Sequence, residues 1–438
     1  MKTMTVLRRA ALLLTLATCT PTAARAQLAN TMPAALGMGE NYTAAARGYA
    51  AVAWNPANLG LPDGPSASAM LGATRLAGGL GPVTLSDLHR YQDETVPLDV
   101  RERWLADIRQ AGGQTGGAGV DVGWAAFQVG RFAAQLSTSG RAVNDVSPGF
   151  AQLLLVGNAD DAGNPLDIDL GGSVVDAEAY STGAVSFAVP LPRPPGVTAL
   201  AIGVTAKYTI GHALARTGGS TGQAGADPAG MELSFPLAYT PVVHDGNRYW
   251  VRSGGGFGVD VGAALRAGDL TVSAVVQNVV STFEWDLDRL RYRPLELVFR
   301  EDETETDTDW QPMTGAPAET RALVADATFR PSFAAGVAWR QSAALLVAAD
   351  ARLGSGDGMA TRPPVHAGIG MEYRPVRWLP LQAGTAWVRT ADERDGMQFA
   401  GGAGIQLGSF TISASGARRR AGPASETMFM VSLLAHTF

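Results

Sequence analysis

The chain has 438 residues, with 34 Lys and Arg against 40 Asp and Glu, so its formal net charge is −6. No stripe of basic residues is available to neutralise phosphates, which argues against nucleic acid as a partner. After the first residues, no apolar run approaches the roughly 20 residues of a membrane-spanning helix. Composition therefore excludes nucleic-acid-binding proteins and helical membrane proteins.

The N-terminus is typical of a secretory signal peptide. Met1–Arg9 is basic, Ala10–Ala17 is apolar, and Ala24-Arg25-Ala26 forms an A-x-A cleavage site. We therefore assign residues 1–26 to a signal peptide. The alternative is lipoprotein processing at Cys19, the one cysteine of the chain, because Leu16–Cys19 resembles a lipobox.

The C-terminus predicts a destination. Met428–Phe438 is an extended-looking run that ends on an aromatic residue. A terminal aromatic residue on such a strand resembles the assembly signal of bacterial outer-membrane β-barrels, although any strand can end a chain. We expect Phe438 to be recognised by the barrel-assembly machinery and the protein to reside, among lipids, in the outer membrane of a Gram-negative-type bacterium.

The body of the chain alternates with a side-chain period of two. Val197–Ile210, Phe257–Leu265, Leu345–Leu353 and Val365–Tyr373 each have one apolar face. A soluble β-sandwich shows the same alternation, but lengths near ten residues favour strands that cross a membrane. Charges opposite the apolar faces should face the lumen, because a Lys or Arg facing lipid at mid-depth costs roughly 2–4 kcal/mol. These charges are Lys207, Asp260, Asp350, Arg352 and Glu372.

Loop lengths predict the strand count. Tight and long connections alternate strictly if strands begin near residues 66, 119, 131, 180, 197, 254, 270, 332, 343, 364, 379, 398, 409 and 428. This gives an all-β transmembrane barrel of 14 antiparallel strands. It requires local hairpins around Met231–Trp250 and Leu290–Phe329 to belong to outer loops; as wall strands they would raise the count to 16 or 18. Short helices are expected in outer loops at Asp99–Gln110 and from Ser147 to Asn158.

The segment Gln27–Pro65 has no strand periodicity. Its stretches Ala35–Tyr42 and Ala50–Gly60 resemble the start of the long-chain fatty acid transporter (FadL) superfamily and its PorV-type relatives. The resemblance implies that residues 27–65 form a hatch, carrying an Asn55-Pro56-Ala57 motif, inside a barrel formed by residues 66–438. Pro56 fixes its own φ and Asn55 can cap a turn, so an ordinary Asn-Pro turn is the alternative.

No motif indicates an enzyme or a cofactor. Gly218–Gly222 matches G-x-S-x-G, but no apolar strand leads into it as a nucleophile elbow requires. The five histidines are scattered. A run of acids offers a weak calcium candidate without EF-hand spacing, and a solvated outer loop is the alternative. Its residues are Glu301, Asp302, Glu303, Glu305, Asp307 and Asp309.

Three functions follow from these observations. The first is a plugged channel for passive passage of a small hydrophobic ligand. The second is a structural or secretion-partner barrel of PorV type, whose long outer loops would bind a secreted protein. The third is an outer-membrane enzyme, which the absent Ser/His pairing argues against.

Overall fold

The computed structural model describes residues 28–160, 162–226, 229–241, 252–300, 303–354, 359, 362–390, 394–422 and 424–436. The signal peptide with Cys19, the terminal Phe438, and Glu301 and Asp302 of the acidic run lie outside these residues.

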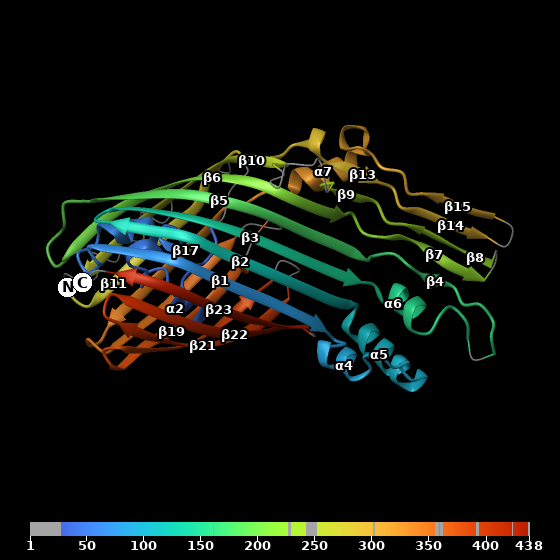
Figure 1. Cartoon of the computed structure of the whole chain (residues 1–438), viewed down its shortest axis with the longest axis horizontal. Helices are drawn as coiled ribbons and strands as arrows, with labels where there is room; N and C mark the ends of the chain where they lie inside the picture. Colours follow the sequence, from blue (N-terminus) through green and yellow to red (C-terminus); the bar gives the residue numbers. More distant parts are fainter. Residues whose placement is uncertain are drawn as a thin grey trace, which may run out of the picture.

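Fourteen antiparallel strands form a closed barrel (Figure 1). Each wall strand pairs with its neighbours, and the ring closes where β1 pairs with both β2 and β23. The predicted strand count is confirmed. The predicted and observed first residues of the strands differ most at β5, which begins at Val174 rather than near residue 180. The wall strands are β1 (Ala67–Gly81), β2 (Gln114–Val129), β3 (Phe132–Val146), β5 (Val174–Pro190), β6 (Ala199–Thr217), β10 (Gly254–Ala267), β11 (Leu270–Ser281), β17 (Ser332–Arg340), β18 (Leu345–Gly354), β19 (Val365–Val376), β20 (Leu379–Arg389), β21 (Asp395–Leu407), β22 (Phe410–Ala421) and β23 (Ala424–His436).

The wall is apolar outside and polar inside. On β6, Ile202 and Val204 are 44% and 45% exposed, whereas the alternate residues Thr205 and Lys207 are buried. Because lipid covers the outer face and the lumen takes polar groups, this is the surface of an outer-membrane barrel. Among the described residues, no helix has the length and apolar character of a membrane span.

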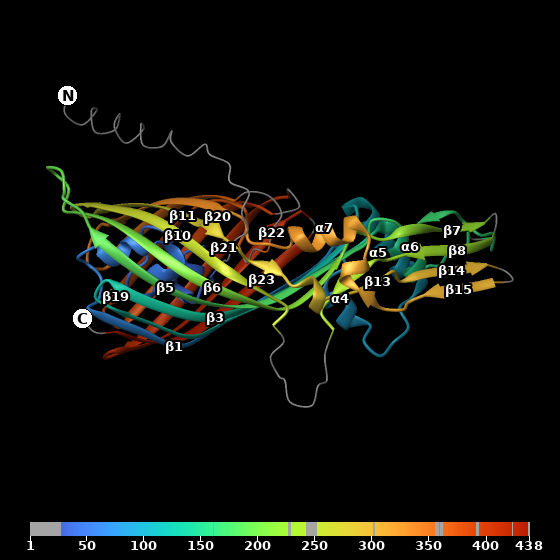
Figure 2. The same cartoon turned by 90° about the horizontal axis from the view of Figure 1, so that it is seen from above.

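Several wall strands continue past the barrel on one side. β5 and β6 have 17 and 19 residues, compared with 9 in β17, and they extend into a projection at the right of Figures 1 and 2. A separate sheet in this projection has the order β15-β14-β8-β7-β4. Its strands are β4 (Ile168–Asp169), β7 (Thr221–Ala226), β8 (Ala229–Ser234), β14 (Glu296–Arg300) and β15 (Glu303–Asp307).

Smaller elements form the outer rim of the barrel. The two segments predicted as local hairpins belong to this rim and to the separate sheet, and they lie outside the wall as expected. Residues 242–250 of the first segment are not described. The 3₁₀ turn η4 (Leu287–Arg289) lies between two short strands, and η5 (Met313–Gly315) follows another. The short strands of the rim are β9 (Leu237–Tyr239), β12 (Glu284–Trp285), β13 (Arg291–Arg293) and β16 (Gln311–Pro312).

Within the described parts of the outer loops there are four α-helices. The two expected helices are confirmed as α5 (Leu98–Ala111) and α6 (Pro148–Leu155), and Ser147 caps α6 through its side chain. They pack on each other around Leu105, Ile108 and Ala151. Two further helices were not predicted: α4 (Leu85–Arg90), which has a Thr84–Asp87 capping box, and α7 (Ala318–Asp326).

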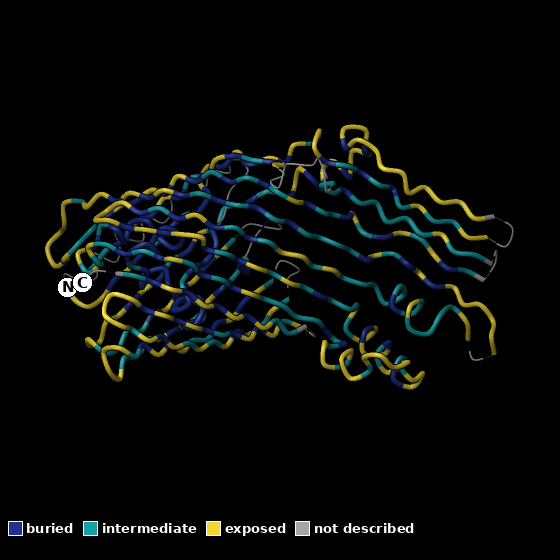
Figure 3. Tube along the Cα trace, in the orientation of Figure 1, coloured by how far each residue is buried: buried dark blue, intermediate teal, exposed yellow. Residues whose placement is uncertain are grey.

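Burial is concentrated within the barrel. Figure 3 shows buried residues gathered there, while the projection is largely intermediate or exposed. The largest apolar cluster is dominated by residues that precede β1, among them Met38, Val52 and Trp54. These residues belong to short helical elements: α2 (Pro33–Gly37), η2 (Gly48–Ala50), α3 (Ala51–Trp54) and η3 (Pro56–Gly60).

Candidate functional site: the luminal segment

Residues Leu28–Leu61, here called the luminal segment, touch wall strands on all sides. α2 contacts β20 to β23, η2 contacts β1 to β3, and η3 contacts β5, β6 and β10. Nearly every residue of the segment is buried, and the blue ribbon of Figure 1 lies within the ring of strands. A 14-stranded barrel is wider than its own side chains can fill, and this segment contributes further side chains to its interior.

The Asn55-Pro56-Ala57 motif docks on the wall. Asn55 Oδ1 accepts a hydrogen bond from the Ala57 amide at 3.0 Å, and Pro56 supplies the fixed φ of the first η3 position. Asn55 Nδ2 donates to the carbonyls of Ala263 on β10 and Ala274 on β11, each at 3.1 Å. The buried Asn55 side chain therefore both closes the turn and ties it to two strands.

Paired glycines let the luminal segment approach the wall. Gly203 of β6 is opposite Gly262 of β10, and a Cβ on either would overlap the Asn55–Ala57 backbone or the Asn55 side chain. Gly370 of β19 is opposite Gly384 of β20, and Met38 makes the same close approach there. Glycine is required at these positions because any side chain would occupy the space of the segment.

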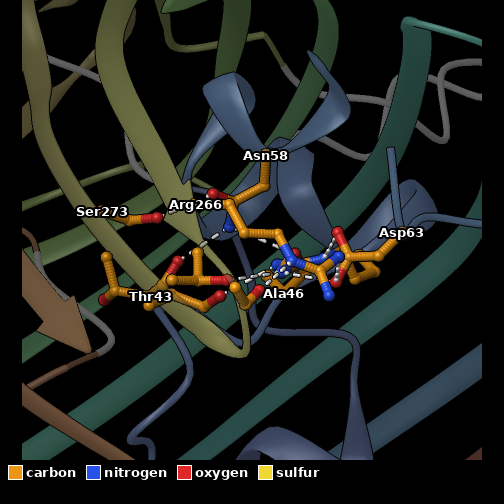
Figure 4. Close-up of polar contacts among 10 residues, drawn as sticks. Thr43, Ala46, Asn58, Asp63, Arg266 and Ser273 are labelled. Carbon is orange, nitrogen blue, oxygen red and sulfur yellow. Dashed lines mark hydrogen bonds and ion pairs between the residues drawn. The ribbon is translucent and has the colours of Figure 1, made fainter. Parts of the chain in front are cut away.

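A polar network anchors the segment at its β10–β11 end (Figure 4). Arg47 Nε and Nη2 each contact the Asp63 carboxylate at 3.0 Å, and Arg266 Nη1 of β10 contacts it at 3.0 Å. Burial raises the pKa of Asp63, but Arg47 and Arg266 outweigh burial and hold that pKa below its ordinary value.

The same network continues along β11. Asn58 Nδ2 donates to the carbonyls of Thr43 and Ala46, and Ser273 Oγ of β11 donates to Asn58 Oδ1 at 2.8 Å. Arg47 Nη2 also donates to Thr271 Oγ1 at 3.2 Å. The segment is thus fastened to the wall by side chains, with no strand pairing among its described residues.

Two of the charges predicted to face the lumen touch the luminal segment. Asp350 Oδ2 on β18 accepts hydrogen bonds from the amides of Tyr42 and Thr43, at 2.8 and 2.6 Å. Arg352, two residues further on, lies with its guanidinium 5.8 Å from the centre of the Trp54 ring. Both side chains are buried.

The other three predicted charges lie elsewhere. Lys207 Nζ donates to Asp260 Oδ1 and to Asn278 Oδ1, both at 2.6 Å, where β11 departs from regular pairing with β10. Glu372 is partly buried and accepts from Arg374 and Gln382, at 3.0 and 3.1 Å. The structure therefore does not bring all five charges into one site.

One buried charged residue of the luminal segment was not predicted from the sequence. Glu40 is 0% exposed and has a φ of 65°. Burial raises its pKa, but the positive charges of Arg75, Arg362, Arg352 and Arg419 outweigh burial and lower the pKa to about 2. The period-two positions of Arg75 and Arg419 on β1 and β22 were a signal that could have placed both arginines inside.

Among the described residues, the remaining candidates do not form a metal site. Within the described part of the acidic run, Glu303–Asp307 forms β15, and no group of three or more His, Cys, Asp or Glu has a metal-binding arrangement there. Ser220 of the G-x-S-x-G match is buried, and its Oγ donates to the Leu170 carbonyl at 2.6 Å. His366 Nε2 lies 3.0 Å from Asn41 Oδ1.

No family model matches this sequence, and no curated protein matches it. Among solved structures, a FadL homologue of Pseudomonas aeruginosa aligns with a TM-score of 0.50 at 13% identity, covering 94% of this chain and 99% of that one. The toluene transporter TbuX of Ralstonia pickettii aligns with a TM-score of 0.50 at 12% identity, covering 93% and 98%. The protein is thus an outer-membrane β-barrel. Its fold is of the FadL type, as the resemblance of its N-terminal segment predicted.

Proposed function

We propose that this barrel is a channel for passive passage of small hydrophobic molecules, with residues 27–65 as its hatch. The observation that carries the proposal is the luminal segment itself. It occupies a pore too wide for side chains alone, yet it is fastened by separable side-chain contacts such as those of Asn55 and Arg47. A segment held in this way can shift without breaking the wall.

Two further observations support a hydrophobic cargo. The structural neighbours include a protein described as a toluene transporter. On the outer side of the lumen, an aromatic cluster of Tyr180, Phe283 and Phe329 has ring centres 4.7 and 5.1 Å apart. The three side chains are at most 2% exposed, so an apolar molecule would contact them only after the cluster opens.

Uptake into proteoliposomes tests the proposal. Purified full-length protein is reconstituted, and entry of labelled toluene and of labelled oleate is followed without any energy source. We expect either compound to enter faster than into empty liposomes, down its gradient only. Rates equal to those of empty liposomes for both compounds would refute a role in hydrophobic passage.

One observation favours the second candidate, a barrel that binds a secreted protein. The outer helices expose large apolar side chains, including Leu85 at 68% and Leu154 at 68%. Exposed apolar groups of this kind are found at protein interaction sites. Cross-linking on intact cells followed by identification of captured exported proteins tests this alternative, and substituting Leu85 and Leu154 by serine should abolish specific capture.

A further inference from the structure

Four arginines converge inside the barrel from distant parts of the chain. Arg75 lies on β1, Arg352 on β18 and Arg419 on β22, while Arg362 precedes β19. Each is at most 8% exposed, and all four act electrostatically on the buried Glu40 carboxylate. Burying this many charges is unfavourable unless each has a partner.

Two of the four arginines have ion-pair partners. Arg75 pairs with Asp121 at 3.0 Å, and Arg419 pairs with Glu426 at 2.7 Å. Arg352 and Arg362 instead both lie beside the Trp54 ring. Within the described residues, Arg352 Nη1, Arg362 Nε and Nη2, and both Glu40 oxygens have no hydrogen-bond partner. Arg352 and Arg362 therefore have donors available to an acceptor.

The surroundings fix these groups in place. Trp54 lies against both guanidiniums, with the Arg362 carbon 4.1 Å and the Arg352 carbon 5.8 Å from its ring centre. Glu40 follows Gly39, and both residues have positive φ, of 65° and 67°. A left-handed backbone is unfavourable for glutamate and persists where surrounding structure imposes it, often at functional sites. The structure around Glu40 thus holds its backbone in this conformation.

We propose that Arg352, Arg362 and Trp54 form an anion-binding site in the lumen, in which the Glu40 carboxylate is the resident anion. When Glu40 withdraws with the luminal segment, a small oxyanion such as a carboxylate takes its place. The proposal goes beyond passage of hydrophobic molecules and does not depend on it, since it concerns a charged ligand and can be measured without transport.

Chemical rescue of a Glu40→Gly variant tests the site. Glycine accepts the positive φ without strain and leaves a space of carboxylate size. Thermal unfolding of the purified full-length barrel is followed with rising formate or acetate, against chloride at equal ionic strength. We expect a saturable rise in midpoint with formate and acetate beyond that with chloride, half-complete at millimolar concentration.

Two controls separate specific binding from general salt effects. Glu40→Gln fills the space without a charge, and Glu178→Ala removes another buried acid, on β5, outside the cluster. Neither variant should show the carboxylate-specific rise. Equal responses in all three variants, or none in Glu40→Gly, would overturn the proposal.

A second measurement applies if Glu40→Gly does not assemble. Glu40→Gln leaves the positive charge of Arg362 without a counter-charge, and removing Arg362 as well should relieve this. The double variant E40Q/R362Q should therefore lose less thermal stability than the sum of the losses in E40Q and R362Q. Strictly additive losses would show that Glu40 and Arg362 are not counter-charges, and the site would be refuted.

Discussion

Replacing Gly203 with alanine should dislodge the Asn55-Pro56-Ala57 turn. A Cβ at Gly203 would lie 2.7 Å from Ala57 Cα, and it would overlap the Ala57 nitrogen and the Pro56 carbonyl carbon. Ordinary carbon contacts lie at about 3.5–4.0 Å, so the turn must retreat by roughly 1 Å. The clash is with backbone atoms, which cannot swing aside as a flexible side chain can.

The retreat also breaks the hydrogen bonds of Asn55. Its Nδ2 lies 3.1 Å from the Ala263 and Ala274 carbonyls, so a further 1 Å removes both bonds. Each bond contributes about 1 kcal/mol, and overpacking costs about 1–3 kcal/mol. The docked state of the luminal segment should lose about 3–5 kcal/mol, which raises its undocked fraction by a factor of about 100–4000.

Limited chymotrypsin digestion in detergent measures this change. Tyr49 and Trp54 are 4% and 2% exposed, so the native segment should resist cleavage and the Gly203→Ala segment should be cut first. The matched control is Gly183→Ala on β5, where the new Cβ meets only Leu136 Cδ1 at 4.0 Å. Digestion of Gly203→Ala at the rate of wild type and of this control would refute the docking geometry.

Three further predictions follow. Asn55→Asp keeps the acceptor for the Ala57 amide but places an oxygen against the Ala263 and Ala274 carbonyls, where Asn55 donates. The luminal segment of this variant should be cut by protease faster than that of the control variant Asn144→Asp. The pKa of Glu40 falls from 4.5 to about 2 on folding, so its carboxylate stabilises the fold above about pH 4.5 and this stabilisation is lost toward pH 2. Between pH 4.5 and pH 2 the thermal unfolding midpoint of the wild type should therefore approach that of Glu40→Gln. A difference between the two midpoints that stays constant with pH would contradict this. Deleting Phe438 should lower the amount of heat-modifiable barrel in the outer membrane, and a normal amount would show that the terminal residue is not an assembly signal.

The wall was predictable because its rules are local. Period-two alternation and the contrast between tight and long connections need only neighbouring residues, and they gave 14 strands with small shifts in their bounds. β5 begins earlier than expected because Val174–Ala179 continues the wall into the outer projection. The alternation there lacks the apolar lipid-facing residues that marked the membrane-crossing part.

The interior was harder to predict because it depends on contacts between distant residues. The sequence shows that Gly203 and Gly262 share a face with polar residues, but only the register of β6 and β10 places them opposite each other and under Asn55. Glu40 and Arg362 are 0% and 5% exposed, although both follow glycine-rich or irregular stretches that predict no burial. Single-strand patterns cannot show which charges meet across a lumen.

Ion conductance across planar bilayers tests the central claim most directly, namely that residues 27–65 close a wide pore. Full-length protein and a variant lacking Gln27–Pro65 are inserted under identical conditions, with assembly of both verified by heat modifiability. We expect the full chain to conduct little and the shortened barrel to form stable, wide channels. An assembled shortened barrel that conducts no more than the full chain would contradict the account.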